Sequence, residues 1–146
     1  MNSKDKGNIG EAIALAEFMK RGIPVSIPYG DNARYDLIAD FNGKLNRIQV
    51  KYCGDEGKTG SVICRCASCT NHTTNKHYTS YKNDVDYFVF YLAQYGKVLL
   101  VPIEIIGNKK DINFRIAPVK NNQKIGVTYA EDFLIEKMLK NYATVA

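Results

Sequence analysis

The dipeptide Asn42-Gly43 lies between two runs, residues 34–41 and 44–52, in which polar and apolar side chains alternate. Asn-Gly is the preferred sequence of the two-residue turns that join antiparallel strands. A two-residue turn pairs Phe41 with Lys44 and so predicts the register of the whole hairpin. In this register we expect Asp36 opposite Gln49 and Arg34 opposite Lys51.

The predicted hairpin places a polar cluster on one of its faces. Because side chains alternate along a strand, Asp36, Gln49 and Lys51 are expected to share a face. The opposite face is expected to point to the core and carries Tyr35, Leu37, Ala39, Ile48, Val50 and Tyr52. A carboxylate and an amide oxygen suit a hard cation such as Mg²⁺, and a nearby lysine can orient water or stabilise charge on a phosphate. An exposed ion pair between Asp36 and Lys51, worth less than about 1 kcal/mol, is the structural alternative.

A helix is predicted over residues 3–21, with Gly22 and Pro24 as stop signals. Its apolar residues recur at three- and four-residue spacing and are Ile9, Ala12, Ile13, Ala16 and Met19. Glu11 lies on the side of this helix that carries Leu15 and Phe18. A carboxylate at the edge of an apolar face needs a cation, a metal or several hydrogen bonds, unless it reaches solvent.

The remaining pattern predicts further strands over residues 25–27, 61–67, 87–92, 98–103 and 113–116, with a loop over 71–83. A last helix is predicted over 129–141, where Thr128 and Glu131 have the spacing of a capping box. The chain has 146 residues, of which 45% are hydrophobic, and no repeat or linker is visible. We therefore expect one α/β domain over residues 1–146.

Basic residues are concentrated where acidic residues are absent. The chain has 20 Lys and Arg against 15 Asp and Glu, a net charge of +5, and both residues 57–83 and residues 112–130 lack any acid. Lysine, arginine and small polar side chains together make most phosphate contacts, so these windows favour nucleic-acid binding over a chance distribution of charge. The residues that we expect to contact double-stranded DNA are Arg34, Lys58, Arg65, Thr73, Thr74, Asn75, Lys76 and His77.

No apolar stretch reaches the roughly 20 residues that a membrane-spanning helix requires. The polar start of the sequence, residues 1–6, does not resemble a secretory signal. We therefore expect a cytoplasmic protein that does not associate with a membrane.

The cysteines permit two interpretations. Cys66 and Cys69 have the spacing of zinc ligands, and His72 and His77 follow them. Cys64 and Cys66, however, alternate within a predicted strand, where cysteine is a small buried hydrophobe. We favour the second interpretation, and we expect no disulfides in a reducing cytosol.

Glu11 on a helix, then Tyr35-Asp36, then Gln49-Val50-Lys51 resemble the motif of the PD-(D/E)XK nucleases. Residues 7–12 and 30–37 are similar to the group I intron-encoded homing endonucleases of that superfamily, of the cyanobacterial transfer-RNA intron type. The resemblance runs over most of the chain. It implies a mixed central sheet with flanking helices and Mg²⁺-dependent cleavage of double-stranded DNA at a long specific site by a homodimer or homotetramer.

By the same resemblance, Glu11, Asp36 and Gln49 would bind metal, and Lys51 would assist the attacking water. Tyr35 stands where the motif has proline, and Gln49 stands where it has an acid, which removes one negative charge from the site. Two other functions share these features. One is a structure-selective nuclease such as a Holliday-junction resolvase, and the other is a catalytically inactive DNA-binding protein.

Overall fold

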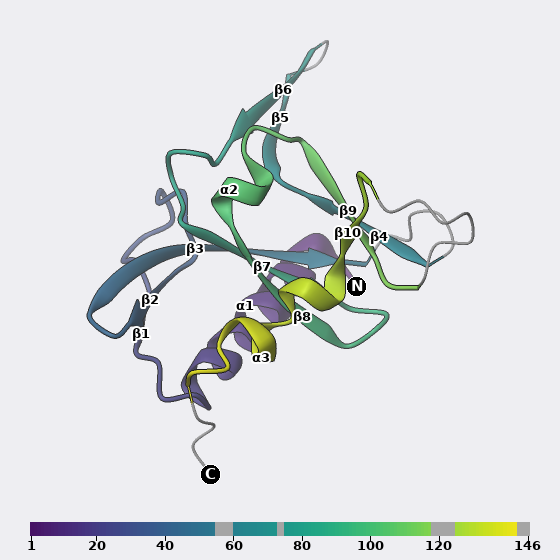
Figure 1. Cartoon of the computed structure of the whole chain (residues 1–146). Helices are drawn as coiled ribbons and strands as arrows, with labels where there is room; N and C mark the ends of the chain where they lie inside the picture. Colours follow the sequence, from purple (N-terminus) through teal and green to yellow (C-terminus); the bar gives the residue numbers. More distant parts are fainter. Residues whose placement is uncertain (55–59, 73–74, 118–124, 143–146) are drawn as a thin grey trace.

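The computed structural model describes residues 1–54, 60–72, 75–117 and 125–142. A five-stranded sheet has the order β1-β2-β3-β7-β8, a three-stranded sheet the order β10-β9-β4, and β5 and β6 form a separate pair (Figure 1). The strands of the large sheet are β1 (Val25–Ser26), β2 (Leu37–Phe41), β3 (Lys44–Cys53), β7 (Tyr87–Leu92) and β8 (Lys97–Pro102). The others are β4 (Ser61–Arg65), β5 (Ala67–His72), β6 (Asn75–Ser80), β9 (Asp111–Arg115) and β10 (Thr128–Tyr129).

The large sheet is mixed, as the sequence predicts. Strand β3 runs parallel to β7, whereas β1–β2, β2–β3 and β7–β8 are antiparallel. The helical elements are α1 (Ser3–Met19), α2 (Ile103–Ile106), the 3-10 turn η1 (Ala130–Phe133) and α3 (Ile135–Met138). The predicted α/β class with a mixed central sheet and flanking helices is confirmed.

The turn between β2 and β3 has the predicted chemistry. Asn42 has a φ of 55° and Gly43 a φ of 91°, as a type I′ turn requires. The predicted register is confirmed from Phe41 opposite Lys44 to Leu37 opposite Ile48. The antiparallel ladder ends there, so Asp36 and Arg34 do not have the cross-strand partners that the register alone predicts.

Helix α1 forms where it is predicted, and the side chain of Asn2 caps it by accepting a hydrogen bond from the backbone N–H of Asp5 at 2.9 Å. Its fully buried residues are Gly10, Ala14 and Phe18. The predicted apolar stripe is confirmed only in part, because Ile13 packs against the core whereas Ala12, Ala16 and Met19 are exposed. The helix backbone passes close to β3, since a Cβ at Gly10 would lie 3.4 Å from Cγ1 of Val50. Within the described part of the chain, no helix is long and apolar enough to cross a membrane.

Two hydrophobic cores lie on opposite faces of the large sheet. On one face, α1 packs against Ile48, Val50 and Val89. On the other, Phe88 and Phe90 pack against residues of β4 and β9, namely Val62, Cys64, Ile112 and Phe114. We expected a single core face, which is wrong because the three-stranded sheet covers the second one. Tyr35 packs against this second core, not against the α1 side.

The segment 71–83 was expected to be a loop, but most of it belongs to the β5–β6 hairpin. Residues 67–72 pair with 75–80 in antiparallel register. This hairpin extends away from the large sheet (Figure 1). The first five residues of β6 are exposed, so the strand lacks the alternation of buried and polar residues by which strands are recognised.

The predicted helix over residues 129–141 is replaced by η1 and α3. Leu134, between them, has an extended conformation with φ −52° and ψ 133°, and it forms a β-bridge with Leu99. Thr128 belongs to β10, and no side chain caps the turn that follows, so the predicted capping box does not form. Pairing with the sheet therefore overrides the local helical pattern.

Candidate active site

Asp36 lies where the chain separates from β3. Its backbone N–H donates to the carbonyl oxygen of Ile48 at 2.8 Å. Its carboxylate oxygen Oδ2 accepts the backbone N–H of Val50, also at 2.8 Å. The carboxylate thus accepts a backbone N–H of β3 at a position where β2 no longer pairs with β3. The predicted pairing of Asp36 with Gln49 is wrong, because the backbone pairing shifts before Leu37.

Glu11 and Asp36 influence each other electrostatically. Partial burial raises the pKa of Glu11, and the negative charge of Asp36 raises this pKa further. Burial likewise raises the pKa of Asp36, although the hydrogen bond from Val50 and the positive charge of Lys51 partly oppose this. Glu11 from α1, Asp36 from the start of β2 and Lys51 from β3 therefore belong to one electrostatic cluster.

Gln49 and Lys51 share a face of β3, as predicted, and lie beside Phe88 and Phe90 of β7. Gln49 is only 8% exposed. Among the described residues, no buried side-chain nitrogen or oxygen lacks a hydrogen-bond partner. The carboxamide oxygen of Gln49 is an acceptor with two lone pairs, so it can serve as a ligand of a cation.

Lys51 lies against an aromatic ring that the sequence analysis did not single out. Its ammonium is 5.2 Å from the centre of the Tyr81 ring, and the guanidinium carbon of Arg34 is 4.2 Å from the same centre. Both distances fall in the range of cation–π contacts. Tyr81 lies in the segment expected to be a loop, and no local pattern distinguishes it there.

Arg34, predicted to bind DNA, makes several contacts within the protein. Its guanidinium donates to the carboxylate of Asp84 at 3.2 Å, to Oγ of Ser68 at 2.8 Å and to the carbonyl of Ser80 at 2.9 Å. These contacts join the segment before Asp36 to the base of the β5–β6 hairpin. A DNA contact of Arg34 stays a prediction.

The oxygen atoms of Glu11, Asp36 and Gln49 fit a hard divalent cation, which prefers carboxylate and amide oxygens. Two carboxyl groups with raised pKa values also gain from a nearby positive charge. Among the described residues, no group of three or more His, Cys, Asp or Glu side chains could hold a metal ion.

Cys53, Cys64 and Cys66 are buried, whereas Cys69 is exposed. Cys64 and Cys66 are buried in the second core, and burial raises the pKa of Cys66 to about 12. These positions agree with the interpretation as small buried hydrophobes. The side chain of His72 lies outside the described residues.

A sequence model of PD-(D/E)XK endonucleases matches residues 1–136. The chain belongs to the PD-(D/E)XK endonuclease family. The predicted family and the predicted nuclease activity are thereby confirmed.

The fold of this endonuclease is similar to a solved structure of a bacterial homing endonuclease, I-Ssp6803I. The two chains have a TM-score of 0.78 and 23% sequence identity, over 96% of this chain and 93% of that one. A search of curated protein sequences finds no match.

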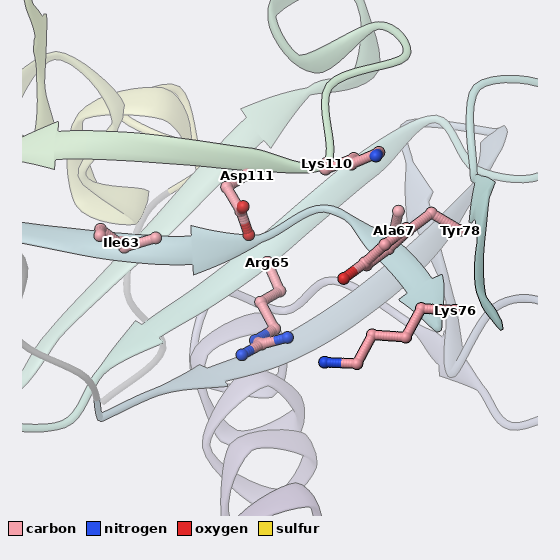
Figure 2. A pocket seen from close by; sticks show the side chains of 7 residues that line it. All are labelled: Ile63, Arg65, Ala67, Lys76, Tyr78, Lys110 and Asp111. Carbon is pink, nitrogen blue, oxygen red and sulfur yellow. The ribbon is translucent and has the colours of Figure 1, made fainter. Parts of the chain in front are cut away.

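Two neighbouring cavities of the endonuclease have lining residues in common, and Lys51 lines one of them. The first, of about 390 Å³, is lined by residues that include Lys51, Arg65, Ser68 and Cys69. The second, of about 410 Å³, lies between β4, β6 and the start of β9 (Figure 2). It brings together Arg65 and Lys76, two of the residues predicted to bind DNA, and adds Tyr78, Lys110 and Asp111.

The other residues predicted to bind DNA have different positions. Asn75 and His77 flank Lys76 on β6 and are exposed. Lys58, Thr73 and Thr74 lie outside the described residues. Lys110 was missed because Asp111 follows it, so it falls outside the acid-free windows. The pairing of β4 with β9 brings it near Arg65, and a single sequence gives no local signal for that pairing.

Proposed function

We propose that this endonuclease hydrolyses phosphodiester bonds in double-stranded DNA at a specific sequence and requires Mg²⁺ or another divalent cation. The observation that carries the proposal is the electrostatic coupling of Glu11, Asp36 and Lys51. Gln49 shares a face of β3 with Lys51, which supports its inclusion in the proposed site. Carboxylates, an amide oxygen and an ammonium are the groups that metal-assisted phosphodiester hydrolysis needs.

Each residue has a proposed role. Glu11, Asp36 and Gln49 hold the cation through oxygen atoms, and the hydrogen bond from Val50 fixes the carboxylate of Asp36. The cation, when bound, supplies positive charge to polarise the scissile phosphate. Lys51 donates a hydrogen bond to the attacking water or to the phosphate, with the Tyr81 ring limiting the positions of its ammonium.

The β5–β6 hairpin is the proposed element for reading DNA sequence. Antiparallel ribbons fit the major groove, and β6 exposes polar and basic side chains that include Asn75, Lys76 and His77. Arg34, Lys58, Arg65, Thr73 and Thr74 complete the proposed contacts.

We further propose that the endonuclease acts inside the cell as a homodimer or homotetramer. The DNA that the proposed reaction needs is found there. A chain of 146 residues offers a small surface for reading a long site. Symmetric assembly doubles the surface available for readout.

The test is incubation of the protein with a library of random DNA duplexes, with and without Mg²⁺, followed by sequencing of all new ends. We expect ends at one recurrent sequence, and only with Mg²⁺. Asp36→Asn is the matched control, because it retains an oxygen acceptor for the N–H of Val50 but loses the charge.

Other outcomes would favour the other functions. Cleavage of four-way junctions regardless of sequence would favour a junction resolvase. Binding of DNA without any metal-dependent ends would favour an inactive DNA-binding protein. Either outcome would overturn the proposal.

A further inference from the structure

The second cavity contains positive side chains that face one another. Arg65 at the end of β4 and Lys76 on β6 extend into the same space (Figure 2). Asp111, directly opposite Arg65 in the β4–β9 register, also lines the cavity. Across the described residues, no salt bridge joins Asp111 to either cation. Like charges that converge without a salt bridge favour an anion between them.

Lys110 adds a third positive charge to the lining of this cavity, apart from the charged groups of Arg65 and Lys76 (Figure 2). The ammonium of Lys110 is 4.5 Å from the centre of the Tyr78 ring, which also lines the cavity (Figure 2). The carbonyl of Lys110 accepts the backbone N–H of Cys66 at 2.7 Å. This hydrogen bond ties the junction of β4 and β5 to the start of β9, so the backbone positions of Arg65 and Lys110 are fixed relative to each other.

The cavity adjoins the active site. The second cavity and the one lined by Lys51 share Ile63, Arg65 and Ala67 as lining residues. A basic path therefore leads from Lys51, past Arg65, to Lys76 and Lys110. Its positive charge suits the phosphates of a nucleic-acid backbone.

We propose that this cavity binds backbone phosphates of the DNA through Arg65, Lys76 and Lys110. This rests on the proposed function, because it assumes that DNA is the substrate. The cavity then holds the duplex so that the scissile phosphate lies at Lys51. Because phosphate contacts carry no base identity, this subsite contributes affinity and position and leaves sequence choice to other residues.

The chain offers a matched control in Lys109, which adjoins Lys110 in sequence. The ammonium of Lys109 is 3.5 Å from the carbonyl oxygen of Ile105, and Lys109 does not line the cavity. Lys109→Ala and Lys110→Ala change the net charge equally. A difference between them therefore reports the cavity and not the charge of the whole protein.

The experiment measures binding of a labelled random-sequence duplex over a series of salt concentrations without Mg²⁺. We expect Lys76→Ala and Lys110→Ala each to flatten the slope of log K against log salt by about one unit. We expect Lys109→Ala to leave it unchanged. Asp111→Asn should strengthen binding, because it removes the negative charge beside the phosphate.

If Lys76→Ala and Lys110→Ala have the same slope as Lys109→Ala, the proposed subsite is wrong. The library experiment separates this failure from that of the proposed function. Ends at one sequence together with equal slopes would overturn only the subsite. Unequal slopes without any cleavage would support a phosphate subsite and overturn the nuclease proposal.

Discussion

The hairpins β2–β3 and β5–β6 are both antiparallel, but their environments are opposite. In β2–β3, Leu37 and Ile48 are 2% and 0% exposed, and a hydrophobic core lies on each face of the large sheet. In β6, five of six residues are exposed. A two-stranded hairpin without its own core has little stability of its own. The first hairpin therefore suits fixed catalytic groups, whereas the second suits contact with a partner.

Arg34 links the two regions. Its contacts with Ser68, Ser80 and Asp84 hold the base of β5–β6, and its guanidinium shares the Tyr81 ring with Lys51. The difference between the hairpins thus shows which part of the protein is fixed by its core and which part depends on a few polar contacts.

Replacing one aromatic residue by alanine in each region should give the largest difference in the free energy of unfolding. Phe88→Ala, at a position 0% exposed beside Gln49, should lower the free energy of unfolding by about 3–5 kcal/mol. Tyr78→Ala, at a position 40% exposed on β6, should cost less than about 1 kcal/mol. Urea unfolding measures both. Equal losses would contradict the contrast between the two regions.

Arg34→Lys tests the residue that connects the two hairpins. Lysine keeps the charge but cannot reproduce the contacts of the guanidinium, so amide exchange in β5–β6 should become faster. The expected loss is about 1–3 kcal/mol of local stability, with β2–β3 unaffected. Arg47→Lys is the control, because Arg47 contacts Asp86 and Asn83 instead. Unchanged exchange in β5–β6 would show that Arg34 does not hold this hairpin.

The same charge can be added to each hairpin. Gln49→Glu adds a carboxylate to the residues that we propose to bind the metal, so Mg²⁺ should raise the Tm of this variant more than that of the wild type. Asn75→Asp adds a carboxylate on exposed β6, where we expect no added response to Mg²⁺. Thermal unfolding with and without Mg²⁺ compares them. An equal response in both variants would argue that Gln49 does not contact the metal.

The smallest expected effect is the pH dependence of the stability that Glu17 contributes in α1. Partial burial of Glu17 raises its pKa, but hydrogen bonds and charges from Lys20 and Arg21 outweigh this and leave the pKa below its ordinary value of 4.5. The carboxylate therefore stabilises the fold above pH 4.5, and this contribution is lost as the pH falls below it. In unfolding experiments over pH, Glu17→Gln should lose less than about 1 kcal/mol at pH 7 and show a weaker acid dependence. An identical acid dependence would contradict this.

The two hairpins also differ in how far they could be predicted from the sequence. Asn42-Gly43 and the alternation around it define the β2–β3 register, and with it the shared face of Gln49 and Lys51. The exact place of Asp36 could not be predicted, because the backbone shift before Leu37 leaves no mark in the alternation. Strand β6 could not be recognised because its exposed residues have no apolar period.

Contacts between distant segments were equally beyond prediction from one sequence. Arg34 and Tyr81 meet through chain folding, and the extended Leu134 depends on its partner Leu99. In both cases the tertiary environment decides the outcome, and local propensity gives no signal.

The most direct test of the active site is the rate of DNA cleavage by the wild type, Lys51→Met and Asp36→Ala in Mg²⁺. Both variants should cleave at least about 10²-fold more slowly, because each loses a group at the reacting phosphate. Their circular dichroism and their DNA binding without Mg²⁺ should stay close to those of the wild type, with Asp36→Asn as the variant that retains the acceptor for Val50. Cleavage at the wild-type rate by both Lys51→Met and Asp36→Ala would contradict the assignment of this site.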